Sequence, residues 1–340
     1  MGTASSRQIR VVAYGGPEVM ELHSFDVGDP APGEAIVRIH FAGISRGDVY
    51  HRRGIIPGAA KPPYVPGYAF SGIVEAVGSG VNSLGPGQTV VAVVRSGAYS
   101  ERIRIPADRL VAAPAGTDLA VAAAAALNYF ISVQMLERFA KVRAAQTILV
   151  HGASGGTGVA LLQLAQTMGV SAWGTCSRAK FALVERYGGR PIDYRSQRFE
   201  DVIRSSQPGV DAAFDPIGHF RRSYSILRKG GTMVAYGLSD SLRNGKPDRL
   251  LATKAFVGGI LLPKLLPDGK RAVFYSAFDL EKSQPQAYAQ DLGKVLELLA
   301  QGKIDPLLMR RFPLELAKEA EAFLESGNVT GTLVLDCDAA

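Results

Sequence analysis

A glycine-rich segment between two apolar segments is the part of the sequence whose residue types and spacing point most directly to chemistry. Gly152, Gly155 and Gly158 lie three residues apart in HGASGGTGV, which follows the apolar run TILV and precedes the apolar segment ALLQLA. Glycine permits a tight turn and the close approach of a ligand, and the N–H groups at the start of a helix bind phosphate. The order of strand, glycine turn and helix therefore predicts a pyrophosphate site for a dinucleotide.

The residues after the next apolar segment indicate which dinucleotide is bound. An NAD site usually has an Asp or Glu about 20 residues further on, which binds the ribose 2′-hydroxyl. Here SAWGTC is followed by Ser177, Arg178 and Lys180, with no acid among them. Two cations would bind a 2′-phosphate, and each charge-assisted contact contributes about 1.5–3 kcal/mol. This favours NADP; the alternative is that both are solvent-exposed residues at the start of a helix.

The elements that must position these residues follow from the hydrophobic pattern. From Thr147 onward, short apolar strands alternate with amphipathic helices, which is typical of a parallel sheet with crossover helices. Strands are expected at residues 147–153, 171–176, 191–195, 211–217, 231–237 and 274–280, and helices at 158–169, 179–188, 199–206 and 220–231. Six such strands fit a doubly wound, Rossmann dinucleotide-binding domain of the α/β class.

The first third of the chain has a different pattern. Segments 34–44, 70–78, 88–94 and 101–114 alternate or run apolar between Gly and Pro residues, which predicts a β-rich unit to about residue 125. The alanine-rich segment 118–142 predicts a helix capped by Asp118. Helices at 288–304 and 315–327 and a strand at 331–336 follow, and we expect this tail to fold back onto the β-rich unit. The predicted domains are 1–126 with 280–340, and 127–279.

Composition excludes several classes of function. The net charge is +7, but the longest basic runs are pairs, which argues against nucleic-acid binding. Two cysteines provide no disulfide framework, so a reducing cytoplasm is expected. No stretch of eighteen apolar residues lacks a charge or a proline, and no secretory signal is recognisable, so we expect no transmembrane segment.

Nine segments carry a family resemblance: SRGDVYHRRG, VPGYAFSGIVEAVGSGV, RSGAYSERIRIP, LNYFISVQML, HGASGGTGV, PIDYR, FDPIG, MVAYGL and GNVTGTLVL. Together they resemble the medium-chain dehydrogenase/reductase superfamily, in particular its zinc-free quinone oxidoreductase (zeta-crystallin-like) branch and the vesicle amine transport protein-like group. The resemblance covers nearly the whole chain. The resemblance implies a GroES-like β-rich catalytic domain, closed by the C-terminal tail, and a Rossmann domain that binds NADPH.

The chain departs from the zinc-dependent members of this superfamily. Those members carry a catalytic cysteine, a Gly-His-Glu segment and a four-cysteine lobe, whereas here Tyr68 and Ala69 replace the His and Glu and no C-x-x-C spacing occurs. Without a metal, hydride must reach an acceptor that is already electron-poor, such as a quinone or an α,β-unsaturated carbonyl. Charge then develops on oxygen and needs a hydrogen-bond donor.

The resemblance also implies site residues. The Asn-x-x-Asp-x-x-x-Arg pattern that lines the nicotinamide site in relatives corresponds to Ser45, Asp48 and Arg52, with Ser in place of Asn. Ile56 stands where many relatives have a tyrosine, so Tyr64, Tyr68 or water would supply the proton. The cofactor positions implied are Asn128 near the nicotinamide, Gly155, Gly156, Thr157 and Gly158 at the pyrophosphate, Ser177, Arg178, Lys180 and Tyr194 around the 2′-phosphate, Gly237 after the fifth strand, and Phe274 and Ser276 near the nicotinamide.

The expected function is an NADPH-dependent, zinc-independent reductase of quinones or conjugated enones that acts on a small hydrophobic substrate as a homodimer. One alternative is a trans-acting reductase of enoyl thioesters, and another is a non-catalytic NADPH-binding partner protein. The apolar segment 250–267 could form a wall of the substrate pocket, contact a membrane, or pack against the Rossmann face or a dimer partner.

Overall fold

A computed structural model describes residues 5–56, 58–243, 246–281 and 283–338. The chain divides into two compact units, one formed by Met1–Phe130 with Gln284–Ala340 and the other by Ile131–Ser283. We call them the β-rich unit and the Rossmann unit, and each is described by itself.

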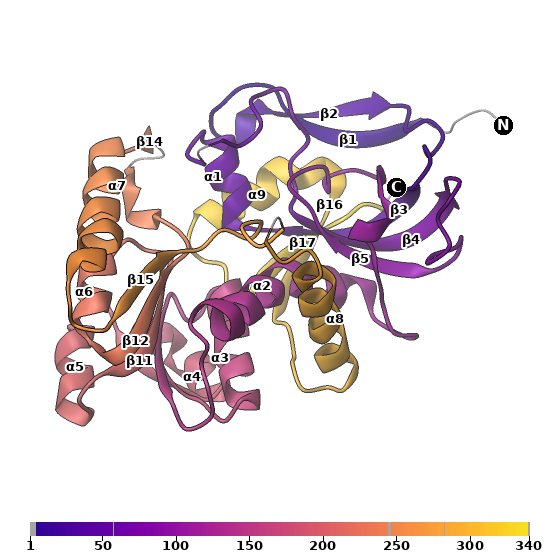
Figure 1. The fold of residues 1–340 in the computed structure, drawn as a ribbon. Coiled ribbons are helices and arrows are strands. Elements are labelled where there is room, and N and C mark those ends of the chain that lie inside the picture. Colours follow the sequence, from indigo (N-terminus) through magenta and orange to yellow (C-terminus); the bar gives the residue numbers. More distant parts are fainter. Residues whose placement is uncertain (1–4, 57, 244–245, 282, 339–340) are drawn as a thin grey trace. The chain divides into compact units, whose positions relative to one another are not determined.

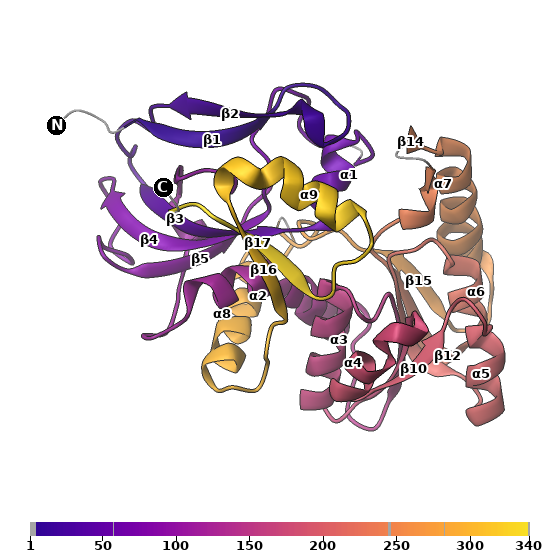
Figure 2. The ribbon, with the colours of Figure 1, turned by 180° about the vertical axis from the view of Figure 1, so that it is seen from behind.

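The β-rich unit is built on a mixed sheet to which both ends of the chain contribute. Its strand order is β16-β17-β3-β4-β5-β7, with β6 also paired to β3. The strands are β3 (Glu34–Ile44), β4 (Ala69–Val77), β5 (Thr89–Val93), β6 (Arg102–Pro106), β7 (Val111–Ala112), β16 (Leu308–Pro313) and β17 (Thr332–Asp336), and β1 (Ser6–Val11) pairs with β2 (Met20–Phe25). Figures 1 and 2 show the yellow strand β17 beside the purple strand β3, with which it pairs antiparallel.

The helices of this unit include one that the hydrophobic pattern did not predict. Helix α1 (Arg46–Arg52) begins directly after β3, and α8 (Ala287–Ala300) and α9 (Ala317–Glu325) come from the tail. Helix α1 begins after its N-cap residue Ser45, because the side chains and backbone N–H groups of Ser45 and Asp48 form a reciprocal capping box. An apolar core of strand residues, including Val37, Phe70 and Leu333, lies between these elements.

The alanine-rich segment forms α2 (Leu119–Val133) and continues as a π-helical turn (Gln134–Phe139). By length and hydropathy alone, Leu119–Phe139 could cross a membrane. However, 72% of its most apolar window is buried within the structure, as is typical of a core helix.

In the described ranges, the Rossmann unit contains a six-stranded parallel sheet of order β10-β9-β8-β11-β12-β15. The strands are β8 (Thr147–His151), β9 (Ser171–Cys176), β10 (Gly189–Asp193), β11 (Val210–Asp215), β12 (Leu227–Ala235) and β15 (Arg271–Phe274). Figures 1 and 2 show α3 (Gly156–Thr167) and α4 (Phe181–Arg186) on one side of the sheet, and α5 (Phe199–Ser206), α6 (Phe220–Ser225) and α7 (Arg249–Phe256) on the other. The predicted doubly wound α/β fold is confirmed, and its order reverses between β8 and β11.

Two boundaries predicted from the sequence are wrong. Helix α6 ends at Ser225 rather than near Gly231, because Leu227 already pairs with Val210 in the sheet and two glycines follow it. The sixth strand occupies residues 271–274 rather than 274–280, because the N–H of Ser276 donates to the side chain of Asp279 and turns the chain.

Candidate functional site

The glycine turn of the Rossmann unit forms an open cradle at the end of β8. Gly152 has φ +64°, a left-handed conformation that favours glycine. A Cβ on Gly158 would lie 2.3 Å from the carbonyl oxygen of Gly152, so only glycine lets the first turn of α3 pack on the loop. A Cβ on Gly155 would meet only that carbonyl oxygen, at 3.5 Å. The twelve-residue helix α3 begins directly after this turn, and the first N–H groups of a helix have no partner within it, so the turn fits a phosphate.

Two strand ends carry the predicted 2′-phosphate residues and bring them together. Ser177, Arg178 and Lys180 follow β9, and Tyr194 follows β10. Strands β9 and β10 are neighbours, and the N–H of Tyr194 donates to the carbonyl of Cys176 at 3.3 Å. The Arg178 guanidinium lies 5.4 Å from the centre of the Phe181 ring, and the Tyr194 side chain is 56% exposed. This surface therefore presents a hydroxyl, a phenol and two cations at one edge of the sheet.

Arg195 belongs to the same surface and was missed in the sequence. Its guanidinium lies 5.7 Å from the centre of the Tyr194 ring. The carboxylate of Asp193 accepts hydrogen bonds from the N–H of Arg195 (3.1 Å) and the hydroxyl of Ser196 (2.9 Å), and these bonds lower the pKa of Asp193. Asp193 thus builds the turn that presents Tyr194 and Arg195. A basic residue at the end of the predicted third strand, 191–195, was the signal that could have identified Arg195.

The remaining predicted residues of the Rossmann unit lie at the ends of other strands. Gly237 follows β12, and a Cβ there would lie 2.7 Å from the carbonyl oxygen of Pro216. Phe274 is the last residue of β15 and is 37% exposed, and the centre of its ring lies 5.9 Å from the centre of the Phe256 ring. Ser276 lies beyond the strand. Because β11 and β12 separate β15 from β8, the structure does not bring Phe274 and Ser276 next to the glycine turn.

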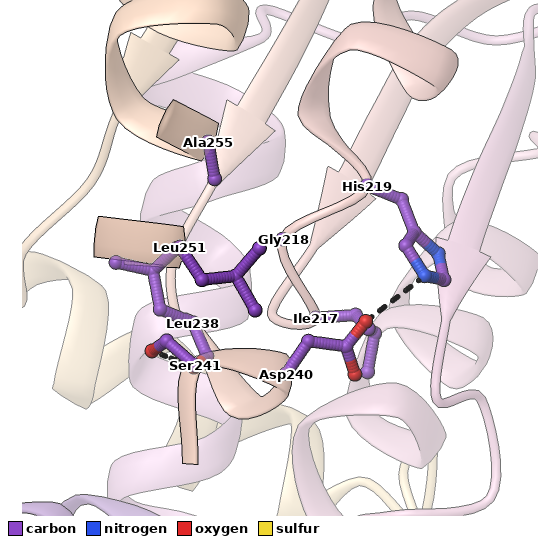
Figure 3. A pocket seen from close by; sticks show the side chains of 8 residues that line it. All are labelled: Ile217, Gly218, His219, Leu238, Asp240, Ser241, Leu251 and Ala255. Atoms are coloured by element: carbon purple, nitrogen blue, oxygen red, sulfur yellow. Dashed lines mark hydrogen bonds and ion pairs between the residues drawn. The ribbon is translucent and has the colours of Figure 1, made fainter. Parts of the chain in front are cut away.

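A cavity of about 460 Å³ lies at the carboxyl ends of β11 and β12 and was not predicted. Its lining residues are Ile217, Gly218, His219, Leu238, Asp240, Ser241, Leu251 and Ala255. Figure 3 shows His219 and Asp240 on one side, with Nε2 and Oδ2 3.2 Å apart, and the apolar side chains of Leu238, Leu251 and Ala255 on the other. The cavity therefore has a polar and an apolar wall, which suits a small amphiphilic ligand.

In the β-rich unit, Asp48 organises the start of α1 rather than facing solvent. The side chain is fully buried; Oδ2 accepts from the N–H (2.9 Å) and hydroxyl (2.7 Å) of Ser45, and Oδ1 accepts from the N–H of Gly67 (2.9 Å). Burial raises the pKa of Asp48, while these hydrogen bonds oppose the rise. The Ser45 hydroxyl donates its proton to Asp48, and the place of Ser45 at the nicotinamide site stays a prediction.

Arg52 lies wholly inside the β-rich unit and joins α1 to α9. Its Nε lies 2.6 Å from Oε2 of Glu321, Nη1 donates to the carbonyl of Gly15 at 2.7 Å, and Nη2 lies 3.3 Å from Glu325. Burial disfavours the charge, but the two facing carboxylates raise the pKa of Arg52. With an exposed fraction of 0%, Arg52 links α1 to α9, and its place at the nicotinamide site stays a prediction.

Tyr64 and Tyr68 flank His51, a residue to which the sequence gave no role. The His51 and Tyr64 rings stack at 3.8 Å, and the buried Tyr64 hydroxyl has no hydrogen-bond partner among the described residues. The Tyr68 hydroxyl lies 3.3 Å from His51 Nδ1, and His51 Nε2 lies 2.8 Å from the carbonyl oxygen of Ala60. Because a carbonyl only accepts, Nε2 carries the proton and Nδ1 accepts from Tyr68.

Burial favours the neutral forms of both Tyr68 and His51. It raises the pKa of Tyr68, so the phenol keeps its proton, and it lowers the pKa of His51, so the imidazole stays neutral and able to accept. Tyr68 is half-buried, whereas Tyr64 is only 7% exposed. Of the two tyrosines, Tyr68 is therefore the one with an oriented hydroxyl.

Asn128 projects from α2 toward the last strand of the same unit. Its side-chain amide donates to the Thr332 hydroxyl at 3.0 Å. The side chain is 9% exposed. Among the described residues, no group of three or more His, Cys, Asp or Glu side chains is arranged to hold a metal ion.

Comparisons with known proteins agree with this architecture. Residues 31–115 match the alcohol dehydrogenase GroES-like domain, and residues 189–335 match the zinc-binding dehydrogenase domain. The synaptic vesicle membrane protein VAT-1 homolog of Danio rerio is 30% identical over 98% of this chain and 70% of its own length. The quinone oxidoreductase of Rattus norvegicus is 29% identical over 98% of both chains.

A solved structure shows the same likeness in three dimensions. The Escherichia coli quinone oxidoreductase complexed with NADPH superposes with a TM-score of 0.85 and 26% identity, over 97% of this chain and 99% of that one. The family expected from the sequence motifs is thus confirmed. The chain belongs to the medium-chain dehydrogenase/reductase superfamily and is homologous to VAT-1 and the quinone oxidoreductases.

Proposed function

We propose that this protein is an NADPH-dependent, zinc-independent oxidoreductase that reduces quinones or α,β-unsaturated carbonyl compounds. The observation that carries the proposal is the open glycine turn after β8 together with the hydroxyl, phenol and cations at the ends of β9 and β10. Relatives named as quinone oxidoreductases, one of them solved with NADPH, support it.

Two groups of residues would hold the phosphates of the cofactor. The backbone N–H groups of Gly155, Gly156, Thr157 and Gly158 would bind the pyrophosphate. Ser177, Arg178, Lys180 and Tyr194, joined by Arg195, would bind the 2′-phosphate. Gly237, Asn128, Phe274 and Ser276 are proposed for the nicotinamide half on the family resemblance. When bound, NADPH supplies a hydride to the acceptor.

Tyr68 is the residue proposed to stabilise and protonate the acceptor oxygen. It occupies the position that a histidine ligand occupies in zinc-dependent members, so the donor there is a phenol O–H. His51 Nδ1 orients the hydroxyl, and burial keeps it protonated. A hydroxyl turned from His51 to the acceptor oxygen donates its hydrogen bond where negative charge develops. Ser45, Asp48 and Arg52 act as positioning residues, because they fix α1 beside this group.

A second candidate is an NADPH-binding protein without turnover. Two features favour it. The Ser45 hydroxyl donates its proton to Asp48, and Ile56 stands where many relatives have a tyrosine, so neither position offers a hydrogen-bond donor to an acceptor molecule. Thermal shift and binding measurements with NADPH would then show an interaction without consumption of NADPH on any acceptor.

The test is NADPH consumption by the purified protein with a benzoquinone and with a conjugated enal, repeated with NADH. We expect NADPH to be preferred by roughly tenfold or more, since a 2′-phosphate contact contributes about 1.5–3 kcal/mol. Arg178→Ala should raise the KM for NADPH and leave that for NADH unchanged, and Arg204→Ala, on α5, is the matched control. Equal use of NADH by the wild-type protein would refute the cofactor assignment.

A further inference from the structure

A network of buried hydrogen bonds connects the glycine turn after β8 to the turn after β11. The N–H of Gly152 donates to Oγ1 of Thr175 at 3.2 Å, and that oxygen lies 3.1 Å from Nδ1 of His151. His151 Nε2 lies 3.0 Å from Oγ of Ser223, which donates to Oδ2 of Asp215 at 2.8 Å. All four side chains are buried, with exposed fractions of 4% or less.

The direction of every bond in this chain is fixed by chemistry. The Asp215 carboxylate only accepts, so the single proton of the Ser223 hydroxyl goes to it. Ser223 must then accept from His151, which places the imidazole proton on Nε2 and leaves Nδ1 as an acceptor. Thr175 fills that acceptor with its own proton, and its oxygen is left to receive the N–H of Gly152. Each polar side-chain atom of this network thus has a hydrogen-bond partner among the described residues.

The hydrogen-bond network spans the point where the strand order of the sheet reverses. Thr175 lies on β9, His151 on β8 and Asp215 on β11, while Ser223 lies on α6. The other oxygen of Asp215 accepts the N–H groups of Ile217 (2.8 Å) and Gly218 (3.1 Å), which form the turn after β11. The network thus fixes the loops on both sides of the crevice in which open α/β sheets bind their ligands.

We propose that Thr175, His151, Ser223 and Asp215 are positioning residues for the dinucleotide: they hold the Gly152 N–H and thereby the orientation of the glycine turn toward the phosphates. The inference rests on the proposed NADPH binding. Apolar side chains of similar shape would fill the same space without the cost of desolvating four polar groups. We therefore attribute the polar network to its effect on the orientation of the glycine turn.

The experiment replaces the hydroxyl that receives the Gly152 N–H and leaves the side-chain shape unchanged. In Thr175→Val, we expect the Kd for NADPH, measured by calorimetry, to rise about fivefold, as for loss of one hydrogen bond. Thr175→Ser keeps the hydroxyl and should bind within about twofold of the wild type. The matched control is Thr147→Val, the same substitution at the opposite end of the neighbouring strand β8.

A second variant interrupts the network at its far end. Ser223→Ala removes the link between His151 and Asp215 without touching β8 or β9, and it should also raise the Kd. A merely structural role would lower the melting temperature of Thr175→Val and Ser223→Ala with the Kd unchanged, and that result overturns the proposal, as does an equal loss of affinity in Thr147→Val. If the wild-type protein itself binds no NADPH, the proposed function fails and this inference fails with it.

Discussion

At the scale of single residues, the structure separates side chains that could act from side chains that hold them. Asp48 and Arg52 match the family pattern in sequence and Ser45 replaces its Asn, yet the hydrogen bonds of all three end inside the β-rich unit. Tyr68 differs because it is half-buried and, among the described residues, its hydroxyl bonds to His51 Nδ1, from which it can turn. Burial of Asp48 and Arg52 is therefore evidence for a positioning role, and Tyr68 is the residue on which the chemistry can be tested.

Removing the Tyr68 hydroxyl should lower turnover and leave cofactor binding intact. For Tyr68→Phe, we expect kcat to fall by roughly 100-fold or more, as for loss of a general acid, with the Kd for NADPH unchanged. Tyr64→Phe, the other tyrosine suggested by the sequence, should change kcat little, because its hydroxyl has no hydrogen-bond partner among the described residues. A Tyr68→Phe variant with wild-type kcat would show that the proton comes from water.

The buried His151 makes stability depend on pH. Burial lowers the pKa of His151 to about 4 from its ordinary value of 6.5, with Asp215 and Glu200 favouring the charged form and His219 and Arg222 opposing it. Between these values the unfolded chain binds more protons than the folded one, so the stabilisation is complete above 6.5 and is lost as the pH falls toward 4.

This dependence can be measured by chemical denaturation at two pH values. The loss attributable to His151 between about pH 7 and about pH 5 is about 2 kcal/mol. His151→Gln should reduce the pH dependence of the unfolding free energy by this amount. An unchanged slope in His151→Gln would mean that this histidine is not buried in its neutral form.

At the scale of elements, the hydrophobic and glycine patterns predicted the strands and turns that depend on residues close together in the sequence. The strands of the parallel sheet are apolar runs because both faces are covered by helices, and β8, wholly buried, is the clearest example. The glycine turn was predictable because Gly152 and Gly158 are required by backbone conformation and packing within a few residues. The same reasoning failed at β15, where a four-residue strand is followed by aromatic residues that also favour strands.

Elements fixed by distant residues could not be predicted in this way. Helix α1 has only seven residues, and its Arg52 pairs with Glu321, 269 positions away. The contact between Tyr68 and His51 likewise depends on the loop that carries Ala60, whose carbonyl sets the imidazole tautomer. The sequence identifies such residues by type and family pattern, but which of them meet is decided by tertiary packing.

At the scale of the whole molecule, the Rossmann unit has an edge and an apolar surface that suit a second copy of the chain. Strand β15 is the last in the sheet order, and no strand in the described ranges pairs with its outer edge. The segment before it exposes leucines, with 79% of Leu265, 53% of Leu262 and 52% of Leu266 accessible. Unpaired edges beside exposed apolar residues are unfavourable for a soluble monomer, and a two-fold symmetric dimer would cover both.

A charge at the most exposed of these leucines should therefore prevent dimer formation. Each leucine that becomes buried contributes about 1.5–3 kcal/mol, and a glutamate there would have to be desolvated instead. We expect light scattering to give twice the chain mass of 36.1 kDa for the wild type and the single mass for Leu265→Glu. Leu316→Glu, at an exposed leucine of the β-rich unit, is the control that should stay dimeric. A wild-type protein of single mass, or a dimeric Leu265→Glu variant, would contradict a dimer held by this surface.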